Sequence, residues 1–195
     1  MRPSVHTTGT TPWKLLPALR AIRTGGVIAY PTEGVFGLGC DPRRPAAVTR
    51  ILAIKQRPVS KGLILIAADQ QQLRPYLAPL SAEQQAQLDH TWPGPVTWVV
   101  PAAIHCPIWV RGAHPTVAVR VSNHPTVVEL CRRLNHPLVS TSANRAGRPP
   151  YRHPRTARHH LGRRVDVIVN APVGTLSGPT PILDLATTHV LRQPT

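Results

Sequence analysis

The chain has 195 residues, 42% of them apolar, which is enough for one domain with a hydrophobic core. The chain has 8 acidic residues and 23 lysines and arginines, which gives a formal net charge of +15. This charge favours the binding of polyanions such as RNA, DNA, nucleotides or phosphate-rich ligands. An arginine-rich host proteome would explain the charge equally well. The 3 cysteines are widely spaced and lack a CxxC pair, which argues against a disulfide framework or structural zinc site and favours a reducing compartment.

The N-terminal half begins without the apolar stretch of a signal peptide. Apolar residues at helical spacing predict a helix over 12–24, ended by two glycines that adopt the left-handed cap easily. A buried strand over 27–30 and a helix over 45–55 follow, each bounded by a proline. The apolar run over 63–67 is typical of a strand covered on both faces and is too short to cross a bilayer. We therefore expect a cytoplasmic protein without a membrane partner.

The C-terminal half continues the alternation of helix and strand. Ser81 to Gln84 has the form of a capping box and predicts the start of a helix. The basic, proline-rich stretch 144–160 is typical of a mobile loop that leads into a short helix. The other predicted elements are strands over 96–100, 117–121 and 138–140, a helix over 125–134, and weaker strands over 165–169 and 182–185. This order predicts an α/β fold with a mixed, largely parallel sheet.

The first candidate site is YPTEGVFGLG over 30–39, which leaves a strand and enters a glycine-rich turn. Thr32 and Glu33 would stand at the carboxyl end of the strand, where open α/β sheets bind ligands. The glycines would let the backbone approach a ligand closely. An ordinary strand-to-helix turn explains the same residues, and this segment alone favours that simpler interpretation.

The second candidate is KQRPVSK over 55–61, with three cations where a helix ends and a strand begins. Alternate residues of an extended segment point the same way, so Lys55 and Arg57 would converge on one anion. Arginine offers a planar fork for phosphate or carboxylate, and Lys61 a compact charge. Cations placed against a helix dipole would give the same pattern, so the segment leaves these two interpretations even.

The third candidate is the strand end PLVSTSAN over 137–144, which presents Ser140, Thr141, Ser142 and Asn144. Small hydroxyls and an amide hydrogen-bond polar ligands well. The same residues also form local turns with their own backbone, and alone the segment favours that explanation.

Arg120 lies inside the apolar strand TVAVRV, where an arginine is costly unless it is paired or faces a polar cavity. This position favours a functional role. The turn WPGPVT is rigid and mainly structural, although Thr97 at its end would line the same cavity.

Several familiar sites have no counterpart in the sequence. The 10 histidines include no HExxH or similar ligand spacing, so a metal site built from protein side chains is not expected. A Walker A loop, a GxSxG elbow and the RNA-recognition, KH and zinc-finger patterns are also missing from the sequence. Nucleotide binding would therefore require another design.

Together these segments resemble the YrdC/TsaC family. The matching residues, in the family's order and spacing, are YPTEGVFGLGCDP (30–42), KQRPVSKGLILIA (55–67), WPGPVTWVVPA (92–102), VAVRVSNHP (117–125) and PLVSTSANRAGRPP (137–150). The resemblance spans about residues 12–192, so we expect the whole chain, 1–195, to form a single YrdC-like domain. It implies a twisted, open sheet with a positively charged, concave cavity.

The resemblance also implies an enzyme, a nucleotidyltransferase. The reaction joins L-threonine, bicarbonate and ATP into L-threonylcarbamoyladenylate and releases pyrophosphate. Partner proteins would then transfer the threonylcarbamoyl group to adenosine 37 of tRNA, and the enzyme itself would dock near tRNA or double-stranded RNA. Mg²⁺ is expected to accompany the ATP phosphates.

The residues expected to act follow from the matched motifs. Lys55, Arg57 and Lys61 would hold the triphosphate and the threonine carboxylate, and Arg120 would add a cation from the sheet. Thr32 would contact threonine. The residues expected to bind the nucleotide and the polar ends of the substrates are Ser140, Ser142 and Asn144, with Thr97 and Thr180 as further cavity residues. The longer relatives carry a second domain for which this chain has no room, and they often have histidine where this chain has Ile66, so that threonine contact is expected to be absent or replaced.

Two other functions fit parts of the sequence. A non-catalytic module for double-stranded RNA or ribosomal precursors would explain the +15 charge and the basic segment 145–164, but not the cations and amide gathered in the matched motifs. A carbamoyl-transfer enzyme of hydrogenase maturation contains a related domain, but those proteins are far longer and include acylphosphatase and zinc-binding regions.

Overall fold

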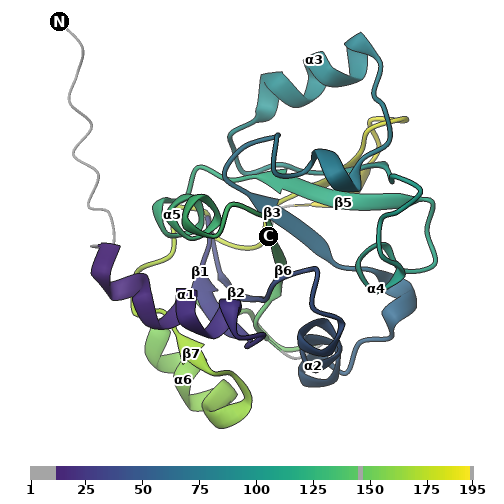
Figure 1. Cartoon of the computed structure of the whole chain (residues 1–195). Helices are drawn as coiled ribbons and strands as arrows, with labels where there is room; N and C mark the ends of the chain where they lie inside the picture. The colour runs from purple at the N-terminus through teal and green to yellow at the C-terminus, as the bar shows by residue number, and fades with distance from the viewer. Residues whose placement is uncertain (1–11, 145–146, 194–195) are drawn as a thin grey trace, which may run out of the picture.

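The computed structural model describes residues 12–144 and 147–193 (Figure 1). Its helical elements are η1 Pro12–Leu15, α1 Leu16–Arg23, α2 Pro45–Lys55, η2 Val59–Lys61, η3 Arg74–Tyr76, α3 Ala82–Thr91, α4 Ile108–Arg111, α5 Pro125–Leu134, α6 Pro154–Leu161 and η4 Gly162–Arg164. Its strands are β1 Ile28–Pro31, β2 Phe36–Gly39, β3 Ile64–Ala67, β4 Thr97–Pro101, β5 Thr116–Val121, β6 Leu138–Ser142, β7 Val167–Ile168, β8 Ile182–Asp184 and β9 Val190–Arg192.

The described strands form one 9-stranded sheet in the order β7-β1-β2-β6-β3-β5-β4-β8-β9. The pairs β1–β7, β3–β5 and β4–β8 are parallel, and the pairs β1–β2, β2–β6, β3–β6, β4–β5 and β8–β9 are antiparallel. The α/β fold with a mixed sheet is confirmed, but the expected excess of parallel pairs is wrong. The apolar run of β3 indicated burial on both faces, and burial does not fix the direction of neighbouring strands.

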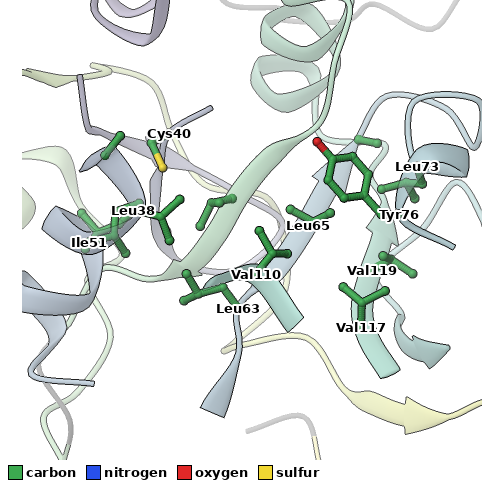
Figure 2. Close-up of a cluster of buried hydrophobic side chains, with 14 of the residues drawn as sticks. Leu38, Cys40, Ile51, Leu63, Leu65, Leu73, Tyr76, Val110, Val117 and Val119 are labelled. Carbon is green, nitrogen blue, oxygen red and sulfur yellow. The ribbon is translucent and has the colours of Figure 1, made fainter. Parts of the chain in front are cut away.

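The two faces of the sheet carry separate hydrophobic clusters. Successive side chains of a strand point to opposite faces, so Leu65 and Ile66 of β3 enter different clusters. Figure 2 shows the first cluster, where Leu65 lies with residues from α2 and α4 such as Ile51 and Val110. The second cluster packs Ile66 against α1 and α5, and Ile22 of α1 is one of its fully buried members.

Helices α1 and α5 cover only part of the sheet face on which they pack. Ile66 of β3 belongs to the cluster beneath these helices, whereas Ile64, on the same face, lines a cavity. On β6 the same division separates Leu138, in the cluster, from Ser140 and Ser142, in the cavity wall. Thus one end of this face is filled by helices and the other end is hollow.

Helix boundaries agree well with the sequence where caps are explicit. Helix α5 occupies 125–134, as predicted, with proline in its first turn and Asn135 in the left-handed conformation at its end. The prediction for 12–24 is confirmed as η1 followed by α1, with Gly25 at φ +84° just beyond it. The short helix expected at the end of 144–160 is α6, while residues 145–146 of that stretch lie outside the described residues.

The segment 30–39 differs most from its prediction. It is not a strand-to-helix turn, because residues 36–39 form β2 and pair antiparallel with β1 as a hairpin. Its FGLG sequence contains two glycines and no β-branched residue, so strand propensity is low, and tertiary packing determines the conformation. Helix α4 and strand β9 were also not predicted.

The capping box of α3 gives a direct test of local stability. Ser81 Oγ accepts from the Gln84 backbone N–H at 3.2 Å, and Gln84 Oε1 accepts from the Ser81 N–H at 3.0 Å. Ser81→Ala removes the first bond and should lower the free energy of unfolding by about 1 kcal/mol in urea titration. Ser81→Thr, which keeps a capping hydroxyl, should retain most of the stability; equal stability of the alanine variant and the parent would contradict this account.

None of the helices in the described ranges is both long and apolar enough to cross a membrane. Cys40, Cys106 and Cys131 are buried free thiols. Burial raises the pKa of Cys106 to about 11, so its thiol stays protonated near neutral pH.

Candidate active site

A cavity of about 660 Å³ opens at the hollow end of the sheet. Of the residues predicted from the sequence, those in its wall are Thr32, Lys55, Arg57, Lys61, Arg120, Ser140, Ser142, Asn144 and Thr180. These residues come from segments far apart in the chain, and the fold brings them to one place. The prediction that Thr97 lines the cavity is wrong: its side chain is fully buried behind the wall.

Lys55 is the last residue of α2, and its ammonium group is directed at the end of β6. Lys55 Nζ lies 2.6 Å from Ser142 O, 3.2 Å from Ser142 Oγ and 2.5 Å from Asn144 O. An ammonium has three N–H bonds, so these contacts use all of them. Burial, together with the nearby charge of Arg57, lowers the pKa of Lys55 to about 8.

Arg57 does not lie beside Lys55 in the way the sequence suggested. The expectation assumed an extended segment, but Lys55 is helical and Gln56 is left-handed at φ 50°, which turns the chain sharply. Arg57 Nε and Nη2 each donate at 3.0 Å, to Gly62 O and Lys61 O respectively. The guanidinium therefore braces its own loop and still lines the cavity with its remaining donors.

The loop that follows Arg57 depends on a glycine. Gly62 has φ +58°, and a Cβ there would lie 2.7 Å from Arg111 O in α4. This close approach lets η2 and α4 pack together and places Arg111 in the cavity wall with Lys61. Glycine is the residue that meets both the positive φ and the short distance.

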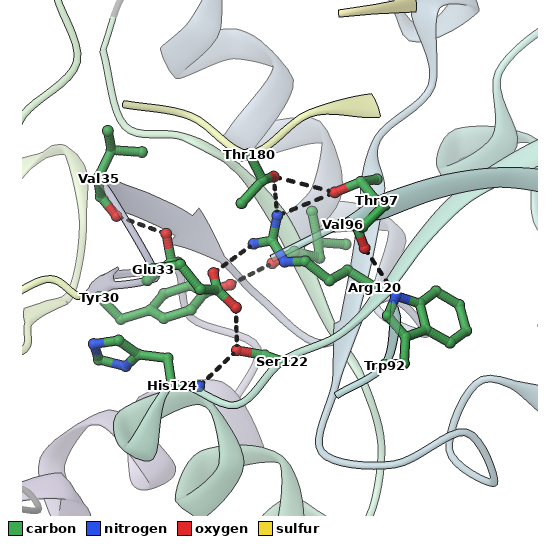
Figure 3. A network of polar contacts seen from close by, with 12 residues as sticks. Tyr30, Glu33, Val35, Trp92, Val96, Thr97, Arg120, Ser122, His124 and Thr180 are labelled. Carbon is green, nitrogen blue, oxygen red and sulfur yellow. Dashed lines mark hydrogen bonds and ion pairs between the residues drawn. The ribbon is translucent and has the colours of Figure 1, made fainter. Parts of the chain in front are cut away.

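Arg120 is at the centre of a buried polar network (Figure 3). Its Nη2 forms an ion pair with Glu33 Oε2 at 3.2 Å, and both side chains are only 5–6% exposed. Its Nη1 donates to Thr97 Oγ1 at 3.1 Å and also to Thr180 Oγ1. An arginine inside an apolar strand is expected to be paired or to face a polar cavity, and Arg120 meets both conditions.

A further arginine, Arg192 of β9, lines the cavity and was not predicted. Its Nε and Nη2 donate to Thr180 O at 3.1 and 2.6 Å. Burial lowers the pKa of Arg192, with smaller contributions from the charges of Arg120 and Arg57. Arg192 directly follows the apolar pair Val190–Leu191 and precedes Gln193, so its sequence context is a weaker signal than the valines on both sides of Arg120.

The electrostatic character of the cavity follows from this composition. Six cationic side chains line it: Lys55, Arg57, Lys61, Arg111, Arg120 and Arg192. Among the described residues the one carboxylate in the wall is Asp184. The cavity is thus strongly positive and suited to a polyanionic ligand.

The wall also presents an acceptor. Asn144 Oδ1 is buried without a hydrogen-bond partner in the part of the chain that the structure describes, while its Nδ2 donates to Arg148 O. Buried amide oxygens are normally paired, so a ligand donor such as an amino or hydroxyl group would satisfy it. Ile66 is fully buried in the second cluster and does not line the cavity.

Metal ligation by the protein has no evident basis in the described ranges, where no three His, Cys, Asp or Glu side chains are grouped to hold an ion. Asp184 Oδ1 already accepts from the backbone N–H groups of Ala186 and Thr187. A metal ion in the cavity would therefore have to be coordinated mainly by atoms of a bound ligand.

Comparisons with known proteins agree on one family. The family model described as "Telomere recombination", which groups Sua5, YciO and YrdC, matches residues 20–194. The threonylcarbamoyl-AMP synthase of Nitrosococcus oceani is 55% identical over 180 residues, covering 92% of this chain and 97% of that protein.

Two solved structures share the fold. The crystal structure of P. abyssi Sua5 complexed with L-threonine has a TM-score of 0.87 at 29% identity, over 93% of this chain and 54% of that one. This chain thus spans about half the length of the Sua5 chain. E. coli YciO has a TM-score of 0.82 at 27% identity, over 94% of this chain and 90% of its own.

Proposed function

The chain belongs to the Sua5, YciO and YrdC family, and we propose that it is a threonylcarbamoyl-AMP synthase. In this proposal it converts L-threonine, bicarbonate and ATP into L-threonylcarbamoyladenylate and pyrophosphate. The observation that carries the proposal is the convergence of separate sequence motifs on one strongly positive cavity of about 660 Å³. The chain would act as one YrdC-like domain in the cytoplasm and supply the modification of tRNA.

The chemistry explains why such a cavity is needed. The threonine amine attacks the bicarbonate carbon, water leaves, and a carbamate forms. A carbamate oxygen then bonds to the α-phosphorus of ATP as the bond to the pyrophosphate oxygen breaks. All reactants except the amine are anionic, so fixed cations offset their repulsion and stabilise the charge that develops on the phosphate. Holding three reactants in line supplies a further part of the rate enhancement.

The proposed roles follow from which donors the protein leaves free. Arg57 and Lys61 would bind the triphosphate, because both line the cavity and Arg57 uses only part of its fork on its own loop. Lys55 would act mainly by holding the strand end that carries Ser142 and Asn144, since its three N–H bonds are used there. Ser142 and Asn144 would then bind the nucleotide.

The neighbouring part of the wall, around Thr32 and Ser140, would bind the amino acid. A Cβ at Gly37 would lie 3.4 Å from Ser140 Oγ and 3.5 Å from Thr32 Cγ2, which places Thr32 and Ser140 beside each other. Thr32 Oγ1 donates to Val35 O at 2.8 Å, so its methyl group and remaining lone pairs are what it offers to a ligand. In this proposal Thr32 and Ser140 contact threonine, with Arg120 and Thr180 nearby.

Magnesium enters the proposal with its nucleotide. The cavity wall supplies Asp184 as its one described carboxylate, so Mg²⁺ would be held chiefly by the ATP phosphates, where it neutralises charge. The substrate would accordingly be the magnesium complex of ATP.

The proposal is tested by pyrophosphate release from ATP and Mg²⁺. Release should require both L-threonine and bicarbonate, because neither alone forms the carbamate. L-Valine, which keeps the branched shape but lacks the hydroxyl, is the matched control. Release that continues without threonine would contradict the proposal.

A non-catalytic RNA-binding module is less well supported than the enzyme. The exposed cations of α6 and η4, including Arg155, Arg158 and Arg163, would suit RNA phosphates, but they do not account for the cavity. We propose that tRNA and the proteins that consume the adenylate are partners of the enzyme. RNA affinity that falls steeply with salt, together with threonine-dependent pyrophosphate release, would fit this combination.

A further inference from the structure

The Glu33–Arg120 ion pair is buried beside the cavity and has no place yet in the proposed reaction. Figure 3 shows Glu33, Arg120, Thr97, Thr180 and Ser122 as one connected set. Arg120 and Thr180 line the cavity, whereas Glu33 stands behind them and does not. Any effect of Glu33 on a substrate would therefore pass through its neighbours.

The direction of the hydrogen bonds in this set can be derived by counting hydrogens. Arg120 Nη1 donates to both Thr97 Oγ1 and Thr180 Oγ1, so neither hydroxyl can direct its own hydrogen at Arg120. The two hydroxyl oxygens are 3.2 Å apart, which allows one to donate to the other.

The choice between the two directions follows from burial. If Thr180 donated to Thr97, the hydrogen of the fully buried Thr97 hydroxyl would have no acceptor in the described contacts, which is costly. If Thr97 donates instead, the remaining hydrogen belongs to Thr180, which lines the cavity. The network thus makes Thr180 a hydrogen-bond donor that faces the ligand.

Both the side chain and the main chain of Glu33 make contacts that stabilise the network around Arg120 and Thr180. Ser122 Oγ donates to Glu33 Oε1 at 2.5 Å and itself accepts from the His124 N–H at 3.1 Å, so that side of the carboxylate is fixed. The segment that leads to Thr180 is also tied to Glu33, because the Leu176 N–H donates to Glu33 O at 3.0 Å.

We propose that Glu33 is a positioning residue that orients Arg120 and thereby fixes the Thr180 hydroxyl as a donor to an oxyanion of a bound substrate. This inference rests on the proposed function. The oxyanion is either the carboxylate of threonine or a phosphate of ATP, and the two sources are separated below by measuring both substrates. Arg120 then acts as a neutralised, oriented group and not as a free cation.

Glu33→Gln is the informative variant because it preserves size but breaks the pattern of donors. The amide oxygen cannot serve both Ser122 and Arg120 as the carboxylate does. An amide NH₂ turned to Arg120 would oppose a donor. One turned to Ser122 would donate to a hydroxyl oxygen that also accepts from His124, and the hydroxyl's own buried hydrogen would lose the carboxylate oxygen that now accepts it. Glu129→Gln, which alters a surface ion pair with Arg133 on α5, is the matched control.

The experiment measures KM and kcat for L-threonine and for ATP in turn, with binding of each by calorimetry as a second readout. Glu33→Gln should raise KM and Kd by about tenfold for one substrate and leave the other within about twofold, the loss expected for one charge-assisted hydrogen bond. The substrate affected identifies the source of the oxyanion. No change for either substrate, or an equal change for both that follows a loss of thermal stability, would overturn the inference.

Thr180→Val supplies the decisive comparison, because it removes the hydroxyl and keeps the volume. If Glu33 acts through Thr180, Glu33→Gln should add less than about twofold to the KM of Thr180→Val. Full additivity of the two effects would show that Glu33 does not act through Thr180. A parent protein without threonine-dependent activity would instead refute the proposed function, so the two failures are distinguishable.

Discussion

Replacing Arg57 with alanine is expected to lower kcat/KM for threonylcarbamoyladenylate formation by about a hundredfold to a thousandfold. The guanidinium lines the cavity and is braced by its own loop through Gly62 O and Lys61 O, so it is preorganised for a phosphate. Its loss removes a fixed charge where negative charge develops and also loosens the loop that carries Lys61. Arg57→Lys should recover only part of the rate, since a lysine cannot brace the loop and bind a ligand with a planar fork.

Arg132→Ala is the control for this result. Arg132 is exposed on α5 and is not among the cavity-lining residues, so its removal deletes the same charge at a distance. Its kcat/KM should stay within about twofold of the parent, as for other surface substitutions. Similar losses in Arg57→Ala and Arg132→Ala would show that overall charge, and not the site, governs the rate. Initial rates of pyrophosphate release over a range of ATP concentrations give both values.

The second large effect concerns Lys55, whose pKa is lowered from 10.5 to about 8 by burial and by Arg57. As the pH rises through about 8, the ammonium loses a donor that it uses on Ser142 and Asn144, and ATP affinity should fall. Folding stability should respond in the opposite sense. The unfolded chain still binds this proton between about pH 8 and 10.5, so the contribution of Lys55 to stability increases across that window.

Calorimetric titration of ATP from about pH 7 to 10 measures the predicted inflection, because the phosphates are already ionised in this range. Lys55→Arg stays charged throughout and should lack the inflection. Lys55→Met, which removes the charge, should bind ATP at least about tenfold more weakly at pH 7, because several hydrogen bonds to a charged group are lost. An ATP affinity that is flat with pH in the parent, or an inflection that persists in Lys55→Arg, would contradict this role.

Local chemistry made parts of this fold predictable. Helix α5 has proline in its first turn and Asn135 at its end, and α3 has its capping box, so both starts can be read from the sequence. The functional position of Arg120 was also predictable from the sequence, because a charge inside an apolar strand must be paired or face a polar cavity. Of the site residues predicted from the family motifs, all but Thr97 lie in the cavity wall.

The sequence could not predict contacts between residues that are far apart in the chain. Lys55 contacts residues 87 and 89 positions later, and no local spacing indicates that direction. Glu33 lies 89 positions from Ser122. Its role as the partner of Arg120 depends on the fold, which brings the turn after β1 to β5 although β2, β6 and β3 lie between these strands in the sheet. The direction of strand pairing was likewise misjudged, because it is set by connections and not by the apolar pattern of a single strand.

The central claim is that this cavity joins three substrates into one adenylate. The most direct measurement supplies ¹³C-labelled bicarbonate with L-threonine, ATP and Mg²⁺, and identifies the product by mass spectrometry. Threonylcarbamoyl-AMP that carries the label should form in step with pyrophosphate, and its rate of formation should fall by about a hundredfold or more when Arg57 is alanine. Pyrophosphate release without a labelled adenylate, or a product whose yield is unchanged in Arg57→Ala, would contradict it.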